Sequence, residues 1–203
     1  KVNVQGYIQY KFAKMFTWKT EVGYEWRDQT QGRYYGPTSY YSRAGDGYTY
    51  LNQALQEQGG TATDAYGYGH VVYSDYLSSR FREATTLDYH QKFNGSDHDL
   101  NILVGQEIIM NKGTNNLQYG YGYDKSWDGA ASIDHLSDAI RMEKRTIIDP
   151  TDNMLSFFAR ANYILFNRYY LTATFRADAS TRFLKSAGNQ WGYFPSVAVA
   201  WRM

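Results

Sequence analysis

The sequence predicts an all-β fold: an antiparallel transmembrane β-barrel segment of about seven strands. Segments of about ten residues alternate apolar with polar or small side chains, the period-two pattern of a strand with two different faces. In the last segment the apolar face begins at Trp191 and ends at Trp201. These two rings are roughly 33 Å apart along a strand. A tilt of about 40° turns this span into a height of roughly 25 Å, the apolar band between the aromatic girdles of an outer-membrane barrel.

Composition agrees with many strands joined by glycine-rich connections. The 203 residues include 21 Tyr, 18 Gly, 3 Pro and no Cys, with a net charge of +1. Disulfides and thiol chemistry are excluded, and no basic footprint for nucleic acid stands out. The mean hydropathy is −0.62, and no apolar run approaches the roughly 18 residues of a membrane helix. No signal peptide precedes Lys1, so we expect a fragment or a processed product.

The clearest hairpin is formed by the first two expected strands, residues 2–12 and 15–27, joined at Ala13-Lys14. Charged side chains occupy one parity of the second strand. A lysine or arginine that faces lipid at mid-depth costs about 2–4 kcal/mol, so we expect the charged parity to face the barrel lumen or a plug. The residues predicted there are Lys19, Glu21, Arg80, Arg82, Arg160 and Arg176.

The remaining expected strands are residues 76–92, 98–110, 154–165, 169–179 and 191–202. Glu83 is out of pattern on the apolar side, and we place it at the outer membrane interface. Asn94-Gly95 is a hairpin-turn signal. Residues 50–58 are expected to form a short helix that ends at Gly59-Gly60.

The connections alternate in length along the chain. Short turns fall at Ala13-Lys14, Asn94-Gly95 and Asn167-Arg168, and longer loops are expected at residues 28–75, 111–151 and 180–190. Outer-membrane barrels have short periplasmic turns and longer extracellular loops, so the three longer loops are predicted to be extracellular. Seven strands do not close a bacterial barrel, and an open edge in lipid leaves backbone groups unsatisfied.

Four tryptophans share a parity with aliphatic neighbours and are expected to point outward into a lipid girdle. They are Trp18, Trp26, Trp191 and Trp201.

The end of the chain resembles the SusC/RagA family of TonB-linked outer-membrane transporters. The residues that carry this resemblance are Tyr169-Tyr-Leu-Thr-Ala-Thr-Phe-Arg-Ala-Asp-Ala-Ser-Thr-Arg-Phe183 and Trp191-Gly-Tyr-Phe-Pro-Ser-Val197, with Ser156-Phe-Phe-Ala-Arg-Ala-Asn-Tyr163 before them. The resemblance implies a larger barrel of about 22 strands, of which this chain would be a segment without the plug domain.

The resemblance also implies a function. It implies part of a TonB-dependent importer of oligosaccharides or peptides in the bacterial outer membrane. Its partners would be a SusD-like lipoprotein lid, the TonB complex through the missing plug region, and membrane lipid. The alternative is a non-transporting structural or adhesive β-protein that displays aromatic loops.

No catalytic, metal or cofactor site is predicted, because the four histidines lack ligand spacing and no nucleophile motif is present. The loop aromatics remain as candidates for substrate or partner contact. Either they fold over one another and over the barrel mouth, or some stack on sugar rings with an exposed face. The candidates are Tyr34, Tyr35, Tyr66, Tyr68, Tyr121, Tyr123 and Trp127.

Overall fold

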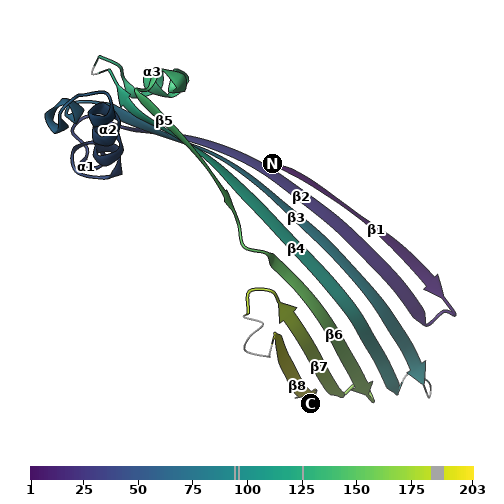
Figure 1. Ribbon diagram of the computed structural model, residues 1–203. Helices are drawn as coiled ribbons and strands as arrows, with labels where there is room; N and C mark the ends of the chain where they lie inside the picture. Colours follow the sequence, from purple (N-terminus) through teal and green to yellow (C-terminus); the bar gives the residue numbers. More distant parts are fainter. Residues whose placement is uncertain (94, 96, 125, 184–189) are drawn as a thin grey trace. The chain divides into compact units, whose positions relative to one another are not determined.

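The protein forms one antiparallel sheet in the computed structural model, which describes residues 1–93, 95, 97–124, 126–183 and 190–203. The strands are β1 (Val2–Phe12), β2 (Phe16–Tyr35), β3 (Gly69–Phe93), β4 (His98–Tyr123), β5 (Arg141–Ile148), β6 (Asp152–Leu165), β7 (Tyr169–Ser180) and β8 (Trp191–Trp201). Their order is β1-β2-β3-β4-β6-β7-β8, and β5 pairs with β4 off this path (Figure 1). The predicted all-β antiparallel class is confirmed, with eight strands where about seven were expected.

Short helices occur only between strands in the described parts of the chain. They are α1 (Tyr40–Arg43), α2 (Asp46–Glu57), η1 (Ala62–Ala65), α3 (Gly129–Asp134) and η3 (Leu136–Asp138). None of the described helices is long and apolar enough to cross a membrane.

The chain divides into two compact units. The sheet unit comprises Lys1–Trp26, Ser78–Lys112 and Pro150–Met203, and the helix-bearing unit comprises Arg27–Leu77 and Gly113–Asp149. The segments 28–75 and 111–151, expected as two separate loops, therefore contribute to one compact unit.

Those two segments also contain regular structure beyond the expected strands. β2 continues to Tyr35, β3 begins at Gly69, β4 continues to Tyr123, and β5 lies within the second segment. The expected boundaries stood where apolar alternation stops. On β2 both faces beyond Trp26 carry mainly polar side chains, so this extension shows no apolar alternation although it is a strand.

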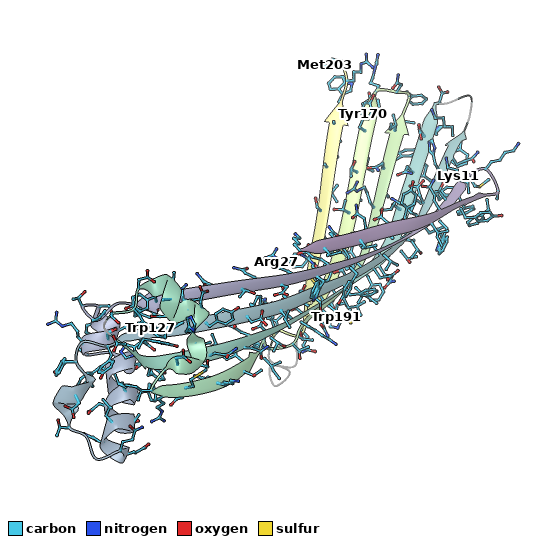
Figure 2. All side chains as sticks on the ribbon, turned by 90° about the horizontal axis from the view of Figure 1, so that it is seen from above. Lys11, Arg27, Trp127, Tyr170, Trp191 and Met203 are labelled. Carbon is cyan, nitrogen blue, oxygen red and sulfur yellow. The ribbon has the colours of Figure 1, made fainter. Side chains whose placement is uncertain are left out.

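In the sheet unit, short turns join neighbouring strands at one end. Lys11, Tyr170 and Met203 lie at that end, and Trp191 lies at the other (Figure 2). Ala13 and Lys14 have φ of 47° and 58°, and Phe166 and Asn167 have φ of 53° and 50°. Two successive left-handed residues are the geometry whose twist matches paired antiparallel strands. Asn94 of the predicted Asn94-Gly95 turn and residues 184–189 of the third expected loop lie outside the described residues.

The sheet unit exposes its apolar face. On β2, Trp18, Val22 and Trp26 are exposed, whereas Lys19 and Glu21 between them are half-buried. On β7 the apolar side chains are likewise on the outside, because Leu171 and Phe175 are exposed. A water-soluble sheet buries its apolar parity, so this arrangement suits a hydrocarbon solvent.

Glu83 interrupts the apolar face but has partners there. Its carboxylate accepts hydrogen bonds from Gln106 Nε2 at 2.5 Å and from Thr85 Oγ1 at 2.6 Å. The Thr85 hydroxyl also lies 2.7 Å from that of Thr20. A polar group in an apolar setting is tolerated when its hydrogen bonds are made, and this cluster makes them.

Candidate functional site

A chain of ion pairs crosses the charged face of the sheet unit. Lys19 pairs with Glu21 on β2, and Arg82 of β3 lies 3.7 Å from the Glu21 carboxylate. Arg82 Nε then donates to Glu107 Oε1 of β4 at 2.6 Å. We call the set formed by these residues with Arg176 and Asp178 the ion-pair chain.

Glu107 is the centre of the ion-pair chain, because it meets two arginines from opposite sides. Arg176 Nη2 of β7 lies 3.3 Å from Glu107 Oε2, while Arg176 Nε bonds the Asp178 carboxylate at 2.8 Å. Arg176 Nη2 also donates at 3.0 Å to the hydroxyl of Ser156, which is fully buried on β6. The guanidinium of Arg176 is therefore held by three strands at once.

Gly105 leaves space for an aromatic ring beside this centre. A Cβ at Gly105 would lie 2.5 Å from the Phe158 ring and 3.0 Å from the carbonyl of Thr85. The Phe158 ring lies under the Arg176 guanidinium, with 5.8 Å from its centroid to Cζ. This stacking is a cation–π contact, so a small residue on β4 helps to orient a charge on β7.

Arg80 and Arg160, the other two residues predicted to face the lumen, are exposed. Arg80 and Arg82 line a hollow of about 510 Å³ against β1 and β2, beside Tyr7, Glu21 and Glu25. Arg160 is opposite Leu103 and Thr174 in the sheet register. A surface with this charge pattern could contact water or a polar protein domain. That all six residues face a lumen or plug stays a prediction.

Trp18, Trp191 and Trp201 lie near strand ends, whereas Trp26 lies in the middle of β2. Trp18, Trp26 and Trp201 are exposed, and Trp201 stacks on Tyr169 with centroids 6.3 Å apart. Trp191 is half-buried because its ring stacks on Phe157 at 6.1 Å. Contact of these rings with lipid stays a prediction.

The helix-bearing unit has its own small core. Leu51 and Ala65 are fully buried and cluster with Tyr121, which is 2% exposed. The Tyr50 ring packs against the Tyr121 ring at 5.3 Å. These contacts join α2 and η1 to the end of β4.

Two candidate stacking residues are therefore wrong as exposed platforms. Tyr121 and Tyr123 are 2% and 1% exposed, so neither offers a free ring face. The Tyr123 hydroxyl donates to the Leu136 carbonyl at 2.9 Å. Burial raises the pKa of Tyr123 to about 12 and also raises that of Tyr121. Their physical role is packing, which a tyrosine-rich sequence alone does not distinguish from display.

The other candidates differ in exposure. Trp127, Tyr34 and Tyr35 are half-buried, and the Tyr34 hydroxyl donates to the Trp127 carbonyl at 3.4 Å. Tyr35 stacks on Tyr41 with centroids 4.3 Å apart. Trp127 also meets the His135 ring edge-on at 5.4 Å. These rings support the fold of the unit and keep part of their surface free.

Tyr66 and Tyr40 offer the most open tyrosine rings of this unit within the described residues. Tyr66 is 50% exposed and leans on Tyr48 at 5.1 Å, and Tyr68 packs at the edge of the core. Tyr40, which is not among the predicted contact residues, is 80% exposed at the start of α1. The position of Tyr40 between the end of a strand and a short helix was the signal that could have predicted its exposure.

His70 is fully buried at the start of β3. Its Nδ1 accepts a hydrogen bond from the backbone N–H of Gly122 at 3.3 Å, so the neutral ring carries its proton on Nε2. Within the described part of the chain Nε2 has no hydrogen-bond partner. Burial lowers the pKa of His70 to about 4 from an ordinary 6.5.

We expect acid to loosen the helix-bearing unit through His70. The folded pKa lies below the unfolded one, so this stabilisation is complete above pH 6.5 and is lost as the pH falls to about 4. The loss is on the order of 3 kcal/mol. Limited proteolysis of the whole protein between pH 4 and 7 measures it. A His70→Gln variant should flatten the dependence, and His90→Gln, an exposed control, should not; equal profiles would contradict the assignment.

The described residues contain no group of three or more His, Asp or Glu side chains placed to hold a metal ion. His90 bonds Asp99 at 2.8 Å, and His98 bonds the Tyr163 hydroxyl. Both histidines are thus occupied by ordinary polar partners.

Comparison with known proteins gives two kinds of match. No family model matches the chain. TonB-dependent receptor SusC of Bacteroides thetaiotaomicron is 37% identical over 106 residues, which is 52% of this chain and 10% of that protein. TonB-dependent receptor P3 of Formosa agariphila is 27% identical across 97% of this chain and 17% of its own length. This chain therefore spans only a small part of the curated relatives that it matches.

The fold has solved counterparts. A chain of the RagAB peptide transporter superposes on 97% of this chain with a TM-score of 0.64 and 22% identity, and 19% of that chain is covered. The RagAB peptide importer in its closed-closed state gives a TM-score of 0.63. The resemblance to SusC/RagA-type TonB-dependent transporters is confirmed by these sequence and structural matches.

Proposed function

We propose that this chain is part of an outer-membrane, TonB-dependent importer of oligosaccharides or peptides that works with a SusD-like surface lipoprotein. The observation that carries the proposal is the exposure of the apolar face of the sheet unit. Its apolar parity is exposed and its charged parity holds a continuous ion-pair chain. The match to TonB-dependent receptors and to a peptide transporter supports the direction of transport and the energy source.

In this proposal the two units have different tasks. The sheet unit contributes barrel wall, with its girdle tryptophans in lipid and its ion-pair chain toward the lumen, where a plug or water satisfies Arg80 and Arg160. The helix-bearing unit is extracellular, because it follows the strand ends opposite the short turns and displays polar and aromatic surface. Its open rings, Tyr40 and Tyr66, contact either the lipoprotein or the substrate.

The experiment that tests the proposal is uptake by cells that carry the full-length gene. Uptake of a fluorescent malto-oligosaccharide series and of a fluorescent peptide mixture is compared in wild-type, gene-deleted and tonB-deleted strains. We expect one probe class to enter only when both genes are present. If neither deletion changes the uptake of any probe while a surface-adhesion defect appears, the transporter proposal is overturned in favour of an adhesive or structural protein.

Point variants then test the helix-bearing unit. A deletion of residues 115–130 would remove Tyr121 from the core of this unit, so the variant that leaves the core intact is Tyr40→Ala combined with Tyr66→Ala. We expect uptake or lipoprotein co-purification to fall at least fivefold at unchanged membrane levels. Tyr193→Ala, an exposed tyrosine of the sheet unit, is the matched control. Unchanged uptake and co-purification would remove these two rings from the site.

A further inference from the structure

The apolar face of the sheet unit is not uniformly filled. One row of the sheet places Ile108, Leu155, Ala179 and Trp191 side by side on β4, β6, β7 and β8. Ala179 is the small member between larger neighbours. A depression of about 280 Å³ lies there, also lined by Met110.

The depression belongs to the face that carries the exposed hydrophobic residues. Ile108 and Met110 share the parity of exposed Ile102 and Val104, and Leu155 shares that of exposed Phe157. Side chains two apart on a strand point to the same side. An occupant therefore comes from the medium that surrounds this face and not from the side of the ion-pair chain.

Polar groups mark one end of the depression. Asn153, Ser180, Thr181 and Gln190 line it there, and Met154 completes the lining. Lys112 follows Met110 by two residues on the same face, about 7 Å along the strand. Lys112 is exposed, and the described residues show no ion pair for it. The polar end with its cation lies at the end of the sheet opposite the short turns.

We propose that this depression and Lys112 together bind an outer-leaflet lipid with an anionic headgroup. An acyl chain occupies the apolar hollow, and a headgroup phosphate meets the Lys112 ammonium at the polar end. The apolar lining selects hydrocarbon, and the cation selects a negative headgroup over a neutral one. The assignment rests on the proposed outer-membrane orientation, in which the end opposite the short turns is the outer one.

The test uses the full-length protein purified in detergent and native mass spectrometry with hexa-acylated, doubly phosphorylated lipid A. Dephosphorylated lipid A is the second probe. Ala179→Trp fills the hollow, and Lys112→Glu reverses the charge. We expect each to lower the affinity for phosphorylated lipid A at least tenfold. Lys112→Arg should preserve it, and Lys112→Glu should not alter the weaker binding of the dephosphorylated probe.

Val199→Trp is the matched control, because it enlarges an exposed side chain on the same face of β8 near the short-turn end. Heat-modifiable gel mobility reports folding, and Ala179→Leu replaces any Ala179→Trp protein that fails to fold. Unchanged affinity in the Ala179 variants overturns the proposal. Loss there without any effect of Lys112→Glu means nonspecific hydrocarbon contact and also overturns it.

A third outcome points to another occupant. If Ala179→Trp splits an oligomer in detergent and lipid affinity is unchanged, the hollow is a contact between copies, and the lipid proposal fails. Uptake measured on the same variants keeps the two proposals apart. If the wild type binds lipid but shows no TonB-dependent uptake, only the transport function is refuted. If it shows uptake but the variants bind lipid A as tightly as the wild type, only the lipid site is refuted.

Discussion

Replacing Gly122 with alanine will lower the free energy of local unfolding of the helix-bearing unit by about 3 kcal/mol. Gly122 has φ of +82°, a left-handed conformation that costs a side chain about 1–2 kcal/mol. An added Cβ would also lie 2.7 Å from Leu51 Cδ1 and 2.9 Å from Ile140 Cδ1. Leu51 is fully buried, so the clash falls in the core of the unit.

Hydrogen exchange of the whole protein, followed by mass spectrometry, measures this effect. We expect faster exchange in α2, at the start of β3 and at the end of β4, with little change in β7 and β8. Gly59→Ala is the matched control, because Gly59 has φ of +88° but no atom within 4 Å of the added Cβ. It reports backbone strain alone. Equal exchange in the two variants would mean that the clash with Leu51 has no energetic weight.

The strands of the sheet unit were predictable because apolar and charged side chains alternate along them. On β2 the tryptophans at 18 and 26 and the charges at 19 and 21 give a clear period of two. The same logic fails beyond Trp26, where both faces of the extended strand are polar. β5 was missed for a related reason: Arg141 to Arg145 carries four charges on a strand that pairs with β4.

The helix near residue 50 was predictable from the glycines that follow its C-terminal end. Gly59 has the positive φ of a helix terminator, and α2 ends at Glu57. Its start at Asp46 was missed, because the cap at Gly45 makes no side-chain hydrogen bond and so leaves no sequence signature.

The roles of individual tyrosines could not be predicted from local sequence. Tyr121 sits between glycines in a segment that reads as an open loop, yet it is buried because Leu51 and Ala65, far along the chain, pack on it. The burial of His70 could not be predicted for the same reason, because its sequence neighbours do not show which residues pack on it. Long-range packing decides which polar or aromatic side chain is displayed, and alternation carries no information about it.

The largest effect in the sheet unit is expected from Glu107→Ala. Glu107 is 9% exposed and bonds Arg82 at 2.6 Å and Arg176 at 3.3 Å. Its loss leaves two guanidinium groups near each other without their shared carboxylate. Breaking a buried pair from one side costs about 3–5 kcal/mol and an exposed pair costs at most about 1. Both arginines are partly exposed, so we expect a loss of about 2 kcal/mol.

Urea unfolding of the full-length protein in detergent, arranged as a double-mutant cycle of Glu107→Ala with Arg176→Ala, isolates the coupling. Asp178 and Ser156 still hold Arg176 when Glu107 is removed, so we expect a coupling of about 1 kcal/mol rather than the full loss. Glu143→Ala is the control, because the Glu143 side chain pairs with Arg141 at 2.8 Å but is 32% exposed, against 12% for Glu107. A coupling no larger than for Glu143 with Arg141 would show that the pairing of the strands holds the charged face in place without help from the ion-pair chain.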